Sequence, residues 1–410
     1  MSVVRIAPAH IVIVSGVVAA LHIGKVAPAI PVLQASLGMS LVEAGFLLSL
    51  IQFAGMIAGV LIGVANDRFG PRRSLLLGQA TLCLASLAGM YARGPTDLLV
   101  ARAVEGFGFL LTVLPGPALI RQLVAPDRLA LHLGLWGTYM PAGTTLAFVG
   151  GPLVMPVLGW PGLWGLLGLL SAGTAAWVYL RVPADAQQRG AAQSTAEAGS
   201  WIRNLRITLG SIEPWRIALS FATYSSQWIA VIGFLPSIYA KAGLSGQLAG
   251  ALTALASVVN VIGNIAAGRL MHRAVRPRQL LYAGFLTMAI ATFVAFVPWT
   301  DGAPAVRYVA VIAFSMIGGI IPATLFMLAV EAAPDERTVS TTVGWMQQIS
   351  STGQFLGPPL VAWVASRVGG WHWTWAVTGG ACAIGLLLAR GAGRAKEAAR
   401  AGAAGPAGRA

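Results

Sequence analysis

The chain has 410 residues, of which 57% are hydrophobic and only 10% are charged. Soluble domains carry charge on about a quarter of their residues, so this composition excludes a soluble protein with a polar surface. It indicates a polytopic membrane protein. The net charge of +14 would suit a nucleic-acid partner, but the basic residues follow the pattern of a membrane topology instead, and we expect no nucleic-acid binding.

About twelve apolar runs are long enough to cross a bilayer, since roughly 30 Å of hydrocarbon takes about 20 helical residues. The runs are continuously apolar, which favours helices over barrel strands, where apolar and polar residues alternate. The expected spans are residues 9–33, 43–65, 74–92, 97–120, 131–158, 161–181, 215–240, 246–268, 279–298, 305–330, 338–366 and 372–390.

The basic residues gather at one side of these spans. If the N-terminus is cytoplasmic, the external loops and adjacent helix ends hold only Arg93, Lys241, Arg307 and Arg367, and Lys25 and Arg102 fall within spans. Nearly all the others then face the cytoplasm, so the positive-inside rule predicts that both termini are cytoplasmic. The high Ala, Gly and Arg content is typical of a bacterium, whose cytoplasmic (inner) membrane is the expected location.

No catalytic pattern stands out in the sequence. It has no phosphate-binding GxxxxGK[ST] loop and no cluster of metal-ligand residues, so we expect neither an enzyme nor an ATP-driven pump, and no cofactor. Cys83 and Cys382 are interpreted as packing residues.

The two halves of the chain resemble each other at a shift of about 205 residues. AGVLIGVANDRFGPRRSLLL at 58–77 aligns with GNIAAGRLMHRAVRPRQLLY at 263–282, and in this register His22 falls on Gln227. The repeat predicts two related bundles joined by a polar cytoplasmic linker. The expected parts are a bundle at 1–181, a linker at 182–213, a bundle at 214–390 and a basic tail at 391–410.

A charged loop, GVANDRFGPRR, follows the second span. It matches the pattern G-x-x-x-D-R-x-G-x-R-R at Gly63, Asp67, Arg68, Gly70, Arg72 and Arg73. With this motif and its two sets of six spans, the chain resembles the major facilitator superfamily over residues 5–392. The resemblance implies an all-α integral membrane fold of 12 transmembrane helices in two pseudo-symmetric six-helix bundles, which acts as a secondary transporter by alternating access.

The same resemblance implies that the charged loop is a conformational latch. The three arginines set topology, Gly63 and Gly70 permit close approach and a turn, and Asp67 pairs with Arg121 or with the N-terminus of the eleventh span. The alternative is that the charges only retain the loop in the cytoplasm. In the second copy His272 stands at the position of Asp67, so the latch should be asymmetric.

Two further motifs bear on the subgroup. RAVEGFG in the fourth span matches R-x-x-Q-G-x-G except that Glu105 replaces glutamine, and GGPLV in the fifth has the Gly-Pro of an antiporter motif without its following glycine pair. The second departure weakens assignment to the drug antiporters. GLWGTYMPAGTTLA resembles one helix of the cyanate and nitroimidazole transporter-like branch.

Ionisable residues inside spans cost about 3 kcal/mol each and suggest function. His22 and Lys25 lie one helical turn apart, and so do Arg102 and Glu105. We interpret His22, Lys25 and Arg102 as cavity or substrate-binding residues and Glu105 or His22 as the proton carrier. The alternatives are that Lys25 extends to the outer interface and that Arg102 and Glu105 form only an intrahelical ion pair.

Tyr139, Gln227, Asn260 and Gln347 are further cavity candidates, although about half of such polar residues only bridge helices. Because the cavity cations outnumber Glu105, we expect a small organic or inorganic anion, or a neutral polar solute, carried with protons by a monomer. The alternatives are a proton-coupled multidrug exporter and a non-transporting membrane sensor or scaffold.

Overall fold

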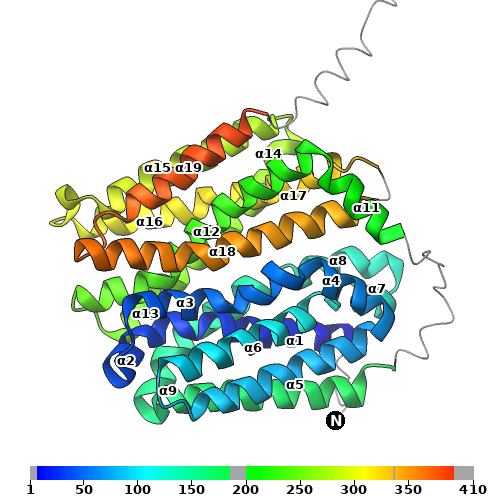
Figure 1. Ribbon diagram of the computed structural model, residues 1–410, viewed down its shortest axis with the longest axis horizontal. Coiled ribbons are helices and arrows are strands. Elements are labelled where there is room, and N and C mark those ends of the chain that lie inside the picture. Colours follow the sequence, from blue (N-terminus) through cyan, green and yellow to red (C-terminus); the bar gives the residue numbers. More distant parts are fainter. Residues whose placement is uncertain (1–6, 185–199, 336–337, 392–410) are drawn as a thin grey trace, which may run out of the picture. The chain divides into compact units, whose positions relative to one another are not determined.

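The computed structural model describes residues 7–184, 200–335 and 338–391 (Figure 1). Within them, nothing is described of the side chains at 60, 63–69, 130 and 200–201. The described residues form α-helices and short 3-10 helices and contain no strand, which confirms the all-α prediction. Residues 185–199 of the predicted linker and the predicted tail from 392 lie outside the described residues.

The first part of the chain forms ten helical elements. They are α1 (Pro8–Gly24), α2 (Val26–Leu37), α3 (Leu41–Ser49), η1 (Leu50–Gln52), α4 (Phe53–Phe69), α5 (Pro71–Met90), α6 (Pro95–Val113), α7 (Gly116–Leu123), α8 (Pro126–Trp136) and α9 (Tyr139–Arg181).

The rest of the chain forms the remaining described elements. They are α11 (Ser200–Leu209), which lies in the predicted linker, α12 (Ile212–Lys241), α13 (Gly246–Val258), α14 (Asn260–His272), α15 (Pro277–Phe296), η3 (Pro298–Thr300), α16 (Pro304–Gly318), α17 (Ile320–Glu331), α18 (Val339–Val368) and α19 (Thr374–Ala389).

Several spans that were expected as continuous helices are interrupted. Proline has no N–H to donate to the carbonyl four residues earlier, so a helix is weakened one turn before it. Three interruptions agree with this rule. Helices end at or next to Gly24, Gly137 and Gly318, and in each case a proline lies four residues later, at Pro28, Pro141 and Pro322. The break between α8 and α9 thus lies one turn before Pro141, whereas α18 continues through Pro358 and Pro359.

Eight stretches of the described chain are long and apolar enough to cross a membrane, judged by length and composition alone. One of them, Pro126–Arg181, holds two expected spans, divided at Gly159 where the backbone leaves the helical region (φ 68°, ψ 173°). The other expected positions are occupied by α5, α18 and the shorter α19. The arrangement is consistent with the twelve-helix prediction.

The described chain forms two compact units, of which the first comprises Met1–Ala198, Trp228–Val258 and Ser351–Trp371. In this unit α1 packs against α9, and α5 packs against both α6 and α9 (Figure 1). The α5–α6 contact is close, since a Cβ on Gly108 would lie 2.9 Å from the carbonyl oxygen of Gly78. Small residues permit this backbone contact, as is usual between membrane helices.

The second unit comprises Gly199–Gln227, Val259–Ser350 and His372–Ala410. Here α15 lies beside α16 and α19 (Figure 1). Both units contain segments of the second half of the chain, so the predicted division into bundles at 1–181 and 214–390 stays a prediction.

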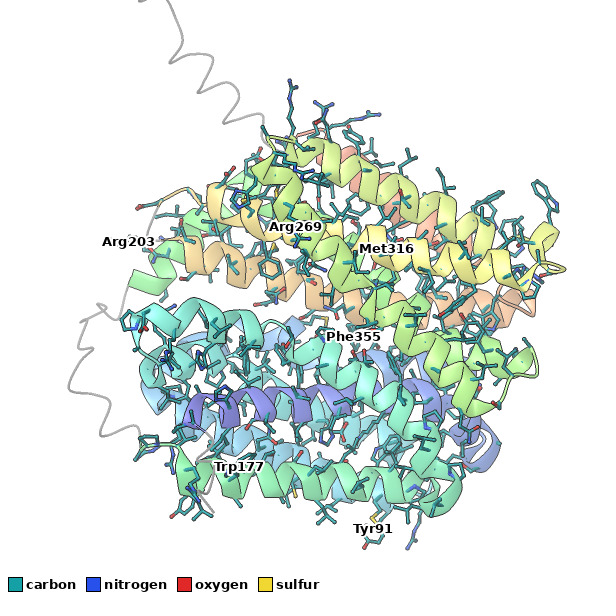
Figure 2. The ribbon with its side chains drawn as sticks, turned by 180° about the vertical axis from the view of Figure 1, so that it is seen from behind. Tyr91, Trp177, Arg203, Arg269, Met316 and Phe355 are labelled. Atoms are coloured by element: carbon teal, nitrogen blue, oxygen red, sulfur yellow. The ribbon has the colours of Figure 1, made fainter. Side chains whose placement is uncertain are left out.

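Two contacts of the second unit illustrate its packing and its surface. Met316 of α16, labelled in Figure 2, contacts α14 so closely that a Cβ on Gly263 would overlap its carbonyl oxygen. Outside the spans, His372 lies 3.2 Å from Asp301, and this hydrogen bond holds the pKa of Asp301 below its usual value.

We expect Gly263→Ala to destabilise the protein by about 1 to 3 kcal/mol, because the new methyl group has no room between α14 and α16. The matched control is Gly268→Ala in the same helix, where nothing lies within 4 Å of the added Cβ. Alanine favours a helix over glycine by about 0.5 to 1 kcal/mol, so the control should be neutral or stabilising. Thermal unfolding in detergent measures both, and equal shifts would contradict the close contact.

Candidate functional site

The interruption of the first span positions two of the predicted site residues. α1 ends at Gly24 and α2 begins at Val26, and His22 and Lys25 lie at this junction. Both side chains are 0% exposed. Lys25 is therefore buried within the first unit and does not extend to a surface, which decides against the interfacial alternative.

The other two ionisable residues come from α6. Arg102 and Glu105 are 2% and 1% exposed and occupy successive turns of one helix face. α6 lies close to η1 because Gly106 has no side chain: a Cβ there would come within 2.7 Å of the carbonyl oxygen of Ile51. The close approach brings the two α6 side chains to the end of α1.

Arg102 binds the end of α1 through backbone carbonyls. Its Nη1 donates to the carbonyl of His22 at 2.5 Å, and its Nη2 donates to that of Ile23 at 3.4 Å. Its Nε donates to the carbonyl of Leu47 in α3 at 3.0 Å. Carbonyls in the last turn of a helix lack intrahelical partners and carry the negative end of the helix dipole, so a cation is stabilising there.

Glu105 joins the cations of the two helices. Its Oε1 lies 2.5 Å from Lys25 Nζ, and its Oε2 lies 2.9 Å from Arg102 Nη1. His22 Nδ1 is 3.5 Å from the same Oε1. The intrahelical ion pair that the sequence allowed is present, but the carboxylate also pairs with a cation from the first span. We call His22, Lys25, Arg102 and Glu105 the buried charge cluster.

Each hydrogen of the Lys25 ammonium group has an acceptor. Besides Glu105, Nζ lies 2.9 Å from Ser86 Oγ and 3.3 Å from His22 Nδ1. Ser86 donates its own hydrogen to the carbonyl of Trp164 at 2.8 Å, so it accepts from Lys25. The Trp164 ring centroid lies 4.5 Å from Nζ, a distance at which a cation is attracted to the ring face.

His22 extends the cluster to α9. Its Nε2 lies 2.9 Å from Ser171 Oγ. When Lys25 donates to Nδ1, the imidazole is neutral with its hydrogen on Nε2, and it donates to Ser171. Nothing in the sequence marks Ser86, Trp164 or Ser171 as partners of this cluster. They lie 61 to 149 residues from the first-span residues they contact, and serine or tryptophan in an apolar helix carries no distinguishing signal.

The cluster carries a net positive charge. Two protonated cations, one carboxylate and a neutral imidazole sum to +1. Burying charges is costly unless they are paired and hydrogen-bonded, and removing one partner of a buried pair costs about 3 to 5 kcal/mol. The cluster meets these conditions through its carboxylate and the surrounding carbonyls and hydroxyls.

The candidates Gln227 and Asn260 lie in the second unit, apart from the buried charge cluster. Gln227 donates to the carbonyl of Thr223 at 3.0 Å and accepts from Cys382 Sγ at 3.2 Å. Asn260 donates to the carbonyl of Ser315 at 2.7 Å and to the hydroxyl of Tyr224 at 3.0 Å. Both amides therefore bridge helices in this structure.

Two other cavity candidates have different surroundings. Gln347 is exposed on α18. In the first unit, the ring of Tyr139 lies 4.8 Å from that of Trp136 and packs within an apolar cluster.

The stretch predicted as a charged loop is mostly helical, because α4 continues to Phe69 and α5 begins at Pro71, so that the turn is made at Gly70. Gly70, between α4 and α5, has a φ of 92°, a conformation that favours glycine. Arg72 donates to the carbonyl of Tyr179 in α9 at 2.7 Å and lies over its ring, so this arginine contacts α9. Arg121 is exposed in the last turn of α7.

The side chains of Asp67 and Arg68, and the surroundings of Gly63, lie outside the described set. The latch between Asp67 and Arg121 stays a prediction, as does the alternative with Arg73 and its neighbours acting on topology alone.

Comparison with known protein families identifies the superfamily of the chain. The model of the Major Facilitator Superfamily matches residues 12–351. The chain belongs to this superfamily. It is therefore a multi-pass membrane protein and a secondary transporter, a class that is not enzymatic.

Several bacterial transport proteins are similar in sequence to this chain. The hexuronate transporter of Bacillus subtilis is 22% identical over 89% of each chain. The 4-hydroxybenzoate transporter PcaK of Pseudomonas aeruginosa is 25% identical over 78% of this chain and 76% of its own length. The chloramphenicol resistance protein of Streptomyces lividans is 30% identical over 62% of this chain and 63% of its own.

Some relatives are matched only in part: this chain spans 26% of the length of an MFS-type transporter of Mycobacterium tuberculosis described as uncharacterized. Among solved structures, a bacterial homolog of the human lysosomal transporter Spinster, in an inward-facing and occupied conformation, superimposes with a TM-score of 0.75. It is 13% identical and covers 95% of this chain and 96% of its own, which shows a shared fold.

The net charge of the cluster predicts which of two neutralising substitutions destabilises the protein more. Glu105→Gln leaves Lys25 and Arg102 without a counter-charge, whereas Lys25→Gln leaves the Arg102–Glu105 pair balanced. We expect Glu105→Gln to lower the melting temperature of the detergent-solubilised protein more, by a difference equivalent to about 1 to 3 kcal/mol. The reverse order, or equal shifts, would mean that the cluster does not carry the net charge assigned to it.

Proposed function

We propose that the protein is a proton-coupled transporter of a small organic anion, acting as a monomer in the bacterial cytoplasmic membrane with both termini in the cytoplasm. The observation that carries the proposal is the buried charge cluster, which brings the membrane-embedded ionisable groups of the first and fourth expected spans together with a net positive charge. Ionisable groups within the membrane are costly, and coupling to charged solutes is their usual role.

The similar transporters support an anionic substrate. The hexuronate and 4-hydroxybenzoate transporters are named for carboxylates, and each is similar over more than three quarters of its own length. A positively charged first unit would attract a carboxylate by its long-range field before any direct contact. Lys25 and Arg102 supply that field. His22, Tyr139, Gln227, Asn260 and Gln347 remain the proposed polar contacts of the substrate path.

We also propose that the buried charge cluster couples transport of the substrate to the movement of protons. Its members share one set of hydrogen bonds and charges, so a change in the protonation of one member changes the free energy of the others. A proton moving down a membrane potential of about 100 mV supplies about 2.3 kcal/mol toward accumulation of the substrate. Import and export are both compatible with this coupling.

A second candidate is a proton-coupled drug exporter. The similarity to the chloramphenicol resistance protein favours it, together with the Gly-Pro of GGPLV in α9. The resemblance of one helix to the cyanate and nitroimidazole transporter-like branch stays a prediction beside these two.

Transport by purified protein in liposomes tests the proposal. With an imposed proton gradient, we expect gradient-dependent movement of D-glucuronate or 4-hydroxybenzoate, and Glu105→Gln should remove the dependence on the gradient. The matched control is Glu43→Gln, since glutamine can also complete the capping box that Glu43 forms with Ser40. Full gradient dependence in Glu105→Gln would contradict coupling through the cluster, and transport of chloramphenicol alone would favour the exporter.

The latch generates a separate prediction. Asp67→Asn removes the negative charge from the loop while keeping the shape of the side chain, so conformational exchange should be impaired and insertion should not. We expect at least a tenfold loss of the transport rate, about 1.4 kcal/mol, with normal membrane levels of the protein. Wild-type transport by Asp67→Asn would leave the loop with a topological role only.

A further inference from the structure

The number of charges in the buried charge cluster limits which group can exchange a proton. With Lys25 and Arg102 protonated, Glu105 ionised and His22 neutral, the sum is +1. Adding a proton to Glu105 or to His22 raises the sum to +2, whereas removing one from Lys25 lowers it to zero. Uncompensated charge is disfavoured in a buried, membrane-embedded site, so exchange between +1 and zero is the less costly pair of states.

Arg102 does not take part in this exchange. A guanidinium group stays protonated in proteins, and this one donates to the carbonyls of His22 and Leu47 and to the carboxylate of Glu105. It therefore acts as a fixed positive charge that keeps Glu105 ionised. Lys25 is the remaining cation whose proton can leave.

The hydrogen-bond geometry suits both protonation states of Lys25. In the charged state, the ammonium group donates to Glu105, Ser86 and His22 Nδ1, and His22 Nε2 donates to Ser171. In the neutral state, the amine keeps two hydrogens for Glu105 and Ser86, and its lone pair accepts from a hydrogen on His22 Nδ1. Ser171 then donates its hydroxyl hydrogen to Nε2. No side chain has to move, and no polar group loses its partner.

The change of state is a proton relay through the imidazole. Lys25 passes a proton to His22 Nδ1 as His22 Nε2 releases its own proton through the Ser171 hydroxyl to water. In sum, the ammonium ion and one water molecule become the amine and a hydronium ion, and the reverse sequence recharges Lys25. The groups that contact Lys25 from the packed helices are His22 on α1, Glu105 on α6, Ser86 on α5 and the ring of Trp164 on α9. Behind them, Arg102 pairs with Glu105 and Ser171 contacts His22.

We propose that Lys25 is the proton-exchanging group of this transporter, that His22 and Ser171 conduct its proton, and that Glu105 is a fixed counter-ion. The proposal rests on the proton coupling proposed above and assigns it to a residue. From the sequence we expect Glu105 or His22 in this role. In the proposal, Glu105 instead holds Lys25 in position as its counter-ion, and His22 conducts the proton of Lys25.

Lys25→Arg tests the proposal directly, because arginine keeps the positive charge and does not release its proton. We expect this variant in liposomes to lose gradient-driven accumulation of D-glucuronate while still exchanging D-glucuronate across the membrane without a gradient. The matched control is Lys241→Arg, since Lys241 is exposed at the end of α12, and it should behave as wild type. Wild-type accumulation by Lys25→Arg would overturn the proposal.

A second measurement needs no transport. The lysines of the chain are Lys25, Lys241 and Lys396, so isotope labelling of lysine side chains gives a simple NMR spectrum in which the Lys25 signal is the one missing from Lys25→Arg. We expect its Cε shift to change between mildly acidic and mildly alkaline pH while those of the other two stay constant. A constant Lys25 signal would overturn the proposal whatever the transport result.

The two measurements separate the possible failures. If wild-type protein carries none of the probes, the proposed function fails, and the NMR titration still decides whether Lys25 exchanges a proton. If Lys25→Arg does not fold, His22→Ala, which removes the conduit, should slow the NMR-detected exchange of Lys25; unchanged exchange would overturn the role of His22.

Discussion

The ion pairing of Glu105 with cations from two helices is the interaction on which the first unit depends. A carboxylate without water must have partners for both oxygens, and here Lys25 at the end of α1 and Arg102 on α6 supply them. This requirement fixes the axial position of α6 against α1. The interruption of the first span lies at the same place. Pro28 has no N–H to donate to the carbonyl of Gly24, where α1 ends, and Arg102 binds the two preceding carbonyls.

The neighbouring helices are adapted to this centre by small and polar residues. Gly106 lets α6 reach η1, and Ser86 and Ser171 offer hydroxyls from α5 and α9 to Lys25 and His22. Without these hydroxyls the amine and the imidazole would each lose a hydrogen-bond partner, which is costly for a buried polar group. The cluster is therefore a property of four helices, although its charges come from two.

Periodicity and composition predicted the helices, and the resemblance carried by the charged loop motif predicted the family, because these are local signals in the sequence. They also predicted that His22 and Lys25, and Arg102 and Glu105, share helix faces. The sequence did not show that these two pairs meet, since spacing along one helix says nothing about the next. For the same reason it left open whether Lys25 reached an interface, and it did not anticipate the breaks at Lys25 and Gly319, where proline acts one turn away.

The internal repeat shows which residues of the second half stand at the positions of His22 and Lys25. At the shift that aligns the two halves, His22 corresponds to Gln227 and Lys25 to Ala230, and both second-half residues are buried. Gln227 there accepts from Cys382, a neutral contact between helices. A glutamine side chain keeps the hydrogen bonds of a histidine without its capacity to exchange a proton. At these two positions the second repeat therefore preserves a polar contact between helices but not the ionisable pair, and for this reason the proton coupling proposed above is assigned to residues of the first half.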